Sequence, residues 1–155
     1  MMKRLSAVVL CTVCAVSASW AQQAKRDDAQ YVSSKEQVQA LKPDKSGLYA
    51  QTILTRRDNS LAMVTTRDKS GEAELHAAWN DAIFVQDGEA TMTLGGDIQN
   101  PRSVSAGETR GSGITGGKTV TLHAGDYVFV PVNVAHRMMI APGKTIRYAV
   151  VKTRP

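Results

Sequence analysis

Residues 123–139 read HAGDYVFVPVNVAHRMM, and this stretch decides the fold class. The Gly-Asp pair near its start is a typical turn signal, and the apolar run that follows predicts a short buried strand over 127–130. Pro131 ends this strand, because a proline cannot donate a hydrogen bond to a sheet. A second strand then begins at His136. Two short strands at such close spacing are typical of an all-β domain.

The rest of the chain from Gly47 onward repeats this pattern. Short runs of Val, Ile, Thr, Tyr and Leu alternate with turn residues. So many short strands within 155 residues predict one domain, built as a small barrel or a double-sheet jelly roll. The predicted strands cover residues 48–56, 60–66, 73–78, 82–86, 90–94, 119–123, 127–130, 136–140 and 145–152.

The N-terminus is typical of a secretory signal peptide. Lys3 and Arg4 form a basic segment, residues 5–16 are apolar, and small residues around Trp20 predict cleavage after Ala21. The apolar run is too short for a good membrane span, and the residues before the cysteines do not fit a lipoprotein anchor. We therefore expect an exported protein without a membrane anchor after cleavage. A Gram-negative periplasm fits best, and secretion to the medium is the alternative.

Cysteine content and charge exclude several function classes. Cys11 and Cys14 both lie in the predicted signal peptide, so the mature chain has no thiol for catalysis or for metal binding. The net charge is +5, and the mature chain without Lys3 and Arg4 carries about +3. The basic residues are scattered and form no stripe with interleaved aromatic residues. We therefore expect no nucleic-acid partner.

Two segments depart from the strand pattern. Residues 22–46 are predicted to form a lead-in with one short helix, because Ser33 and Glu36 fit a capping box and Pro43 stops the helix. Residues 97–118, DIQNPRSVSAGETRGSGITGGK, are too long for a hairpin turn within the barrel predicted over 47–155. This Gly-rich insertion is either a functional, mobile loop or a disordered surface excursion. It lacks the residues and the strand–helix frame of a phosphate loop.

A second informative stretch is AELHAAWNDAIFVQ, residues 73–86. Side chains two apart on a strand share a face, so Glu74 and His76 point the same way. Asp81 stands at the start of the next apolar run, where a charge is either solvated or bound to something. These three side chains are either a surface accident or most of a metal site.

At this point the sequence resembles the cupin superfamily. The first cupin motif has a His-x-His pair, then a Glu, and a Gly seven residues after that Glu. Glu74 and His76 stand at the pair, Asp81 stands at the Glu, and Gly88 follows at the expected interval.

The second cupin motif is matched more closely. Gly125, Pro131 and His136 fit it, whereas Asn133 replaces a glycine and Ile140 replaces an asparagine. The resemblance covers roughly residues 48–152, and it implies a cupin-type double-stranded β-helix, or jelly-roll barrel. It also places the insertion where cupins have a variable loop.

The resemblance further implies that Glu74, His76, Asp81 and His136 converge inside the barrel. Two carboxylates in a half-buried pocket repel each other and lose hydration, and a divalent cation removes that cost. Imidazoles and carboxylates together suit Mn, Fe(II), Ni, Co or Zn and disfavour Cu(I). Two histidines and one carboxylate resemble a facial triad with open positions, whereas Zn would act as a Lewis acid. The alternative is a barrel that has lost its metal, with Glu74 facing solvent and Asp81 capping a turn.

Two functions follow from this site. The first is a small metalloenzyme that acts on a small oxygen-bearing substrate by oxidation, isomerisation or lyase chemistry, with Glu74 as general base if it is not a ligand. The second is a module that binds a small ligand or a metal for sensing, storage or delivery. A barrel with no pocket is a third option. The resemblance also implies a homodimer through edge strands.

The roles of several other residues are also predicted. His123 lies just before a turn glycine and outside the motif positions, so it is predicted to be a turn or surface histidine. Trp79 lies between His76 and Asp81 and either walls the pocket or is a core or rim aromatic. Phe84, Met138 and Met139 are predicted to pack in the core, and the alternative is that they line an apolar cavity.

Overall fold

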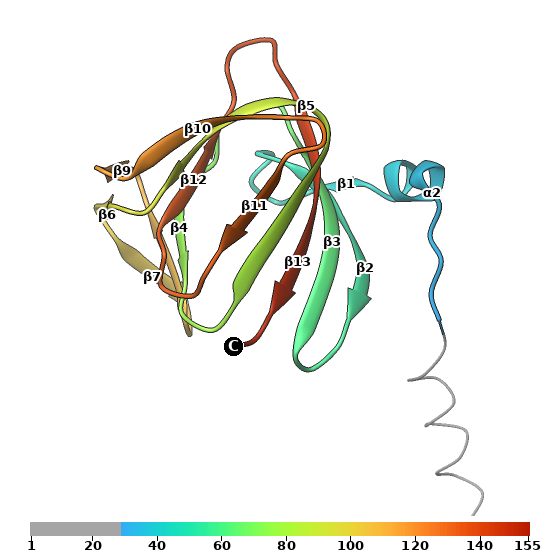
Figure 1. Ribbon diagram of the computed structural model, residues 1–155, viewed down its shortest axis with the longest axis horizontal. Coiled ribbons are helices and arrows are strands. Elements are labelled where there is room, and N and C mark those ends of the chain that lie inside the picture. The colour runs from blue at the N-terminus through green and yellow to red at the C-terminus, as the bar shows by residue number, and fades with distance from the viewer. Residues whose placement is uncertain (1–28) are drawn as a thin grey trace, which may run out of the picture. The chain divides into compact units, whose positions relative to one another are not determined.

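The computed structural model describes residues 29–155, and the predicted signal peptide with its cleavage site lies outside these residues. Antiparallel strands make up most of the described chain, which confirms the all-β prediction (Figure 1). The strands are β1 (Lys42–Pro43), β2 (Ala50–Arg56), β3 (Ser60–Arg67), β4 (Ala73–His76), β5 (Asn80–Leu94), β6 (Asp97–Gln99), β7 (Arg102–Ser105), β8 (Glu108–Gly111), β9 (Gly113–Thr115), β10 (Lys118–His123), β11 (Tyr127–Val130), β12 (His136–Met139) and β13 (Ile146–Thr153).

Strand pairing joins the two halves of the barrel through β5. Within the described residues, the main sheet has the order β1-β2-β3-β13-β5-β12-β4-β8-β7. The first half of β5 also pairs with β11 and the second half with β10, while β6 and β9 form a separate ribbon. One strand therefore runs through both layers of the barrel (Figure 1).

A bulge keeps β5 continuous at Gly88. The backbone there has a φ of 79°, and a Cβ atom would clash with the carbonyl oxygen of Thr145. The register between β5 and β13 also shifts close to this point, so only glycine fits the bulge. The prediction of two strands, 82–86 and 90–94, was wrong, because the Asp-Gly pair bends one strand and does not reverse the chain.

The Gly-rich insertion is ordered into short strands. β6 pairs with β9, β7 pairs with β8, and β8 pairs with β4 of the barrel. Gly111 permits this packing, because a Cβ atom there would clash with Ile98 and with the backbone of Gln99. The prediction of a loop over 97–118, and the idea of a disordered excursion, were wrong. The many glycines of this segment predict a loop, but its short strands form because they pair with strands elsewhere in the chain.

The core follows from alternation along the strands. On β5, Ile83 and Val85 point inward, while Phe84 between them is 47% exposed and stacks on Tyr127 at a ring-centroid distance of 4.9 Å. Phe84 therefore does not pack in the core as predicted, whereas Met138 does. The buried cluster consists of Ile83, Val85, Ala90, Met92, Leu122, Val128, Val130, Met138, Ile140, Ile146, Tyr148 and Val150.

The short helix forms where the sequence predicts it. The helix α2 spans Ser34–Gln39, and Ser33 and Glu36 form the complete capping box. The Ser33 backbone N–H donates to Glu36 Oε2 at 2.8 Å, and the Glu36 backbone N–H donates to Ser33 Oγ at 3.3 Å. Among residues 29–155, no helix has the length and apolar character that crossing a membrane requires.

Candidate metal centre

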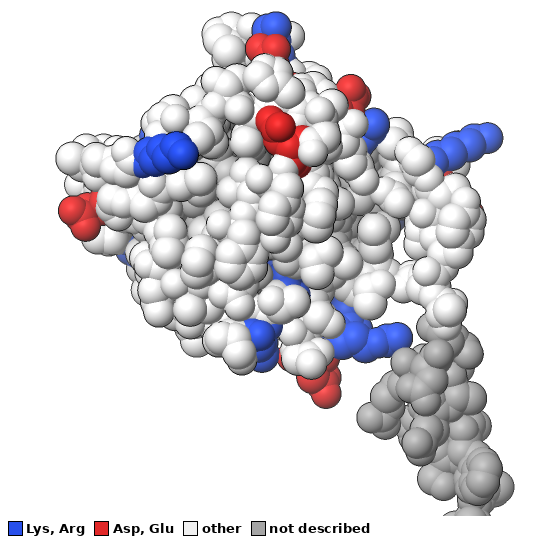
Figure 2. Space-filling model, viewed as in Figure 1, with Lys and Arg blue, Asp and Glu red and all other residues white. Residues whose placement is uncertain are grey.

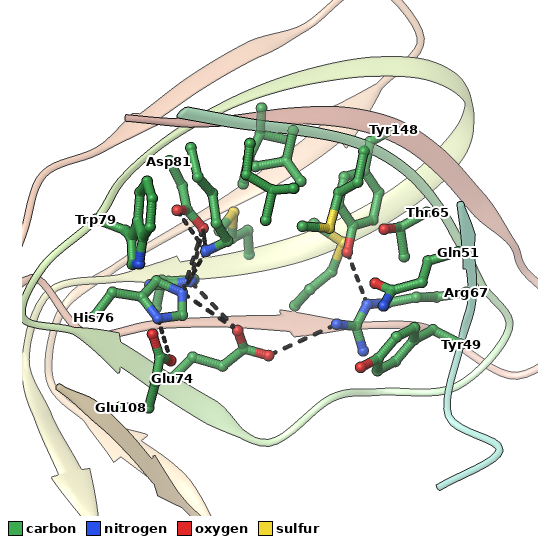
Figure 3. Close-up of a pocket in the computed structure, with 18 of the residues that line it drawn as sticks. Tyr49, Gln51, Thr65, Arg67, Glu74, His76, Trp79, Asp81, Glu108 and Tyr148 are labelled. Atoms are coloured by element: carbon green, nitrogen blue, oxygen red, sulfur yellow. Dashed lines mark hydrogen bonds and ion pairs between the residues drawn. The ribbon is translucent and has the colours of Figure 1, made fainter. Parts of the chain in front are cut away.

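Cross-strand pairing brings the motif residues together. Glu74 and His76 lie on β4, where Glu74 faces His136 of β12 across the ladder. The turn before β12 is fixed by Asn133, which adopts a left-handed conformation with a φ of 62° and donates its N–H to the His76 carbonyl at 2.8 Å. Asp81 enters from the start of β5. All four motif side chains line one cavity of about 300 Å³ (Figure 3).

The two buried imidazoles present the same nitrogen to this cavity. His76 Nδ1 lies 2.6 Å from Glu108 Oε2, and His136 Nδ1 lies 3.3 Å from the Val134 carbonyl oxygen. Each contact suits an Nδ1–H donor, which leaves the Nε2 lone pair facing the cavity, although Lys152 Nζ lies 2.9 Å from that of His76. The two Nε2 atoms are 3.7 and 3.8 Å from the same carboxylate oxygen, Glu74 Oε2.

This geometry fits a divalent transition metal. Glu74, His76 and His136 each offer one ligand atom, and these atoms lie within 4.8 Å of one another. Two imidazole nitrogens with one carboxylate oxygen are the donor set of a facial triad. Burial lowers the pKa of His136, so this ring is neutral and able to bind a metal near pH 7. Burial also lowers the pKa of His76, but the hydrogen bond and charge of Asp81 together with the charge of Glu108 outweigh burial and raise the pKa overall.

The Glu74 carboxylate faces two kinds of partner. Its Oε2 atom points to the histidines, while Oε1 pairs with Arg110 and lies 3.7 Å from Arg67 Nη2. Burial raises the pKa of Glu74, but the charges of Arg110, His136 and Arg67 outweigh burial and lower it. An ionised carboxylate with a lowered pKa is a good ligand and a weak base. The arrangement therefore favours Glu74 as a ligand over Glu74 as a general base.

Asp81 is engaged by a cation that the sequence did not suggest. Lys152 of β13 donates to both carboxylate oxygens at 2.6 and 2.7 Å and lies 2.9 Å from His76 Nε2. Burial raises the pKa of Asp81, but the His76 hydrogen bond and the Lys152 charge lower it overall. Asp81 Oδ2 remains 3.4 Å from His76 Nε2 and 3.9 Å from His136 Nε2. Asp81 thus lies beside the three-residue group, with its charge balanced.

Sequence reasoning missed four charged residues of the cavity. Glu108 and Arg110 lie on β8, directly opposite His76 and Glu74, but their segment was predicted to be a loop. Lys152 could have been found, because it follows Tyr148 and Val150 in the inward alternation of β13. The missed residues are Arg67, Glu108, Arg110 and Lys152.

The other singled-out residues are placed clearly. Trp79 lines the cavity, and the Arg154 guanidinium stacks on its ring at 4.5 Å. The His123 side chain is 65% exposed and lies 3.8 Å from Asp126, as expected for a turn histidine.

Comparisons with known proteins identify the fold. No family model matches the sequence, and no curated protein matches it. Solved structures do match. An uncharacterized protein with a double-stranded β-helix domain from Klebsiella pneumoniae subsp. pneumoniae MGH 78578 is 16% identical, with 82% of this chain and 91% of that chain covered and a TM-score of 0.57. The cupin domain of Schizosaccharomyces pombe Cnp3 is 9% identical, with 69% and 65% covered and a TM-score of 0.51.

A third match is FeII HppE, which is 20% identical, with 81% of this chain and 60% of that chain covered and a TM-score of 0.54. At these identities the likeness concerns the fold. The chain therefore has the double-stranded β-helix fold, as its motifs implied.

Proposed function

We propose that the protein is an exported metalloprotein that holds a divalent metal at Glu74, His76 and His136, with Asp81 beside this group. One observation carries the proposal: both histidine Nε2 atoms and Glu74 Oε2 converge on one end of a cavity. A bound divalent metal would supply Lewis acidity or, as Fe(II), redox chemistry at its open positions. We propose Mn, Fe, Ni or Zn as the metal, and the likeness to FeII HppE puts Fe(II) first for testing.

The chain's own residues support an enzyme that acts on a small oxygen-bearing substrate. Glu108 fixes the tautomer of His76, and Arg110 holds the Glu74 carboxylate. The ammonium of Lys152 reaches the same space, and its N–H that contacts His76 Nε2 would be released for a substrate oxygen when a metal binds that nitrogen. Met92 and Met138 wall the cavity on its apolar side. We propose an oxidoreductase, an isomerase or a lyase.

A second function, binding without turnover, is favoured by the pairing of the carboxylates. Asp81 is held by Lys152, and Glu74 is held by Arg110, so neither is poised to accept a proton. A module for sensing, storage or delivery would need no such base. Ligands that raise the melting temperature without product on long incubation would support this function.

Metal content tests the site. The full chain would be expressed untagged with its own signal peptide, and bound metal measured by mass spectrometry in the wild type, His76→Ala and His136→Ala. The control is His123→Ala, which removes the exposed histidine. We expect near-stoichiometric metal in the wild type and the control and its loss from both site variants, with the fold checked by circular dichroism. A folded wild type that stays metal-free after reconstitution would contradict the proposal.

Activity and export need separate assays. Metal-loaded protein would be incubated with aromatic diols, β-diketones, sugar acids and keto acids, and product formation would favour the enzyme. N-terminal sequencing of the exported protein should begin after Ala21. An intact N-terminus in the cytoplasm would contradict export.

We also propose a homodimer through β11. Within the part of the chain that the structure describes, this strand pairs with β5 on one side only, and Phe84, Tyr127 and Phe129 on these two strands are about half exposed. Figure 2 shows few charged side chains in the middle of the face that contains β11 in Figure 1. Sedimentation should give a dimer for the wild type and a monomer for Phe129→Glu. A wild-type monomer at micromolar concentration would contradict the proposal.

A further inference from the structure

Arg67 presents unused hydrogen-bond donors to the end of the cavity opposite the histidines (Figure 3). Its side chain is only 9% exposed, its Nε donates to the Tyr148 hydroxyl at 2.9 Å, and its guanidinium stacks on Tyr49 at 4.7 Å. Among residues 29–155, neither Nη atom of Arg67 makes a hydrogen bond, and Glu74 is no closer than 3.7 Å. Among residues 29–155, the Arg67 Nη atoms are not fully buried polar atoms without a partner, so they reach the open space of the cavity, where a ligand can accept their N–H groups.

The charges of the cavity indicate that this partner is an anion. Three carboxylates and three cationic side chains line the cavity. Lys152 is paired with Asp81, and Arg110 is paired with Glu74. Arg67 has the weakest pairing of the three cations, because its ion pair with Glu74 is 3.7 Å long and shares the Oε1 atom with Arg110. A divalent metal at the histidine end would add two positive charges to this balanced set. A ligand with negative charge would offset them.

The residues that line the cavity favour a carboxylate with an apolar body as the anion. The planar fork of a guanidinium matches a carboxylate with two parallel hydrogen bonds. Thr65 and Gln51 lie next to Arg67 and offer further polar contacts (Figure 3). Apolar side chains such as Met63 and Ile83 line the remaining wall. In this arrangement the Glu74 carboxylate lies between Arg67 and the histidines.

We infer that the cavity binds a small carboxylic acid with an apolar body, whose carboxylate pairs with Arg67 and whose other end faces the histidines. This inference deepens the proposed function and rests on it for the contact at the histidine end. The Arg67 contact is independent of a bound metal.

Matched acids and amides test the inference. Binding of benzoate and benzamide, salicylate and salicylamide, and mandelate and mandelamide would be measured by calorimetry at constant ionic strength. In the wild type, we expect at least one acid to bind about tenfold or more tightly than its amide, because hydrogen bonds to charged groups are the stronger ones. No acid binding more tightly than its amide in any of the three pairs would overturn the inference.

Variants assign the preference to Arg67. Arg67→Met should reduce the affinity for the acid to that for the amide, whereas Arg102→Met, at an exposed arginine paired with Glu72, should leave it unchanged. A folded Arg67→Met protein that keeps the preference would overturn the inference. If Arg67→Met does not fold, Arg67→Lys keeps the charge without the fork and should lose most of the preference. An unchanged preference in Arg67→Lys would count against the bidentate contact.

Metal analysis of the same samples separates the two proposals. Failure of the metal site would give metal-free protein in which the preference for acids is still measurable. Failure of the carboxylate site would give metal-loaded protein with equal affinity for acid and amide.

Discussion

Replacing Lys152 with methionine should destabilise the metal-free protein by about 3 kcal/mol. The Lys152 ammonium donates to both oxygens of Asp81, whose side chain is 6% exposed. Removing one partner of a buried pair leaves an uncompensated charge, which typically costs about 3–5 kcal/mol. The lower end applies because Lys152 itself is 16% exposed and keeps some contact with water.

A divalent metal should offset much of this loss. The ammonium also lies 2.9 Å from His76 Nε2, so it occupies space next to the candidate ligands and repels a cation there. In Lys152→Met, Asp81 is free to face the metal and the repulsion is gone. If metal binding restores about 2 kcal/mol, the affinity for the metal rises about 30-fold relative to the wild type.

Urea unfolding followed by circular dichroism measures both effects, first in chelator and then in excess Mn²⁺. Lys144→Met, at an exposed lysine paired with Glu89, is the matched control and should change stability little. The double variant with Asp81→Asn should recover most of the loss in chelator, because it removes the stranded charge. A Lys152→Met protein within about 0.5 kcal/mol of the wild type in chelator would refute the reasoning. So would an equal loss with and without metal.

Three further predictions concern other parts of the barrel. Glu108→Gln should lower the metal affinity about tenfold in a chelator competition, because the carboxylate that orients a ligating histidine is lost. The exposed Glu89→Gln is its control, and an unchanged affinity would contradict the role of Glu108. Gly111→Ala should cost about 1–3 kcal/mol in urea unfolding, because the new Cβ atom overlaps Ile98; a neutral change would show that the insertion can relax. Burial raises the pKa of Tyr148 above its usual 10.0, so the unfolded chain loses this proton first and stability falls as the pH rises past about 10. Tyr148→Phe should therefore lose less stability than the wild type between about pH 9 and 11, and an identical loss would contradict this assignment.

The sequence predicted the strands wherever local pattern and tertiary pairing agree. The strand at 127–130 matches β11 in full, because its turn, its apolar run and its proline all act locally. The predicted break between 82–86 and 90–94 was wrong. Pairing with β13, β10 and β12 keeps β5 one strand across the bulge. The strands of the insertion were not predicted for the same reason. A run of three or four residues becomes a strand only when it pairs with a neighbouring strand.

The site residues that belong to the two sequence motifs could be predicted. Glu74, His76, Asp81 and His136 stand at motif positions, and the structure gathers all four around one cavity. Their charged partners were not predictable, because they come from distant parts of the chain. Glu108 is 32 residues from His76 in sequence, and Lys152 is 76 residues from it. Only the register of β8 and β13 reveals these contacts.

The position of β8 has a consequence for how such a barrel can change. The segment that carries it, 97–118, belongs to the insertion, yet two alternate side chains of β8 fix the orientation of His76 and Glu74. Exchange of this one segment between related barrels would alter the basicity of the ligands while leaving the ligands themselves in place. A change in the insertion would therefore alter the surroundings of His76 and Glu74 without any change to the motif residues.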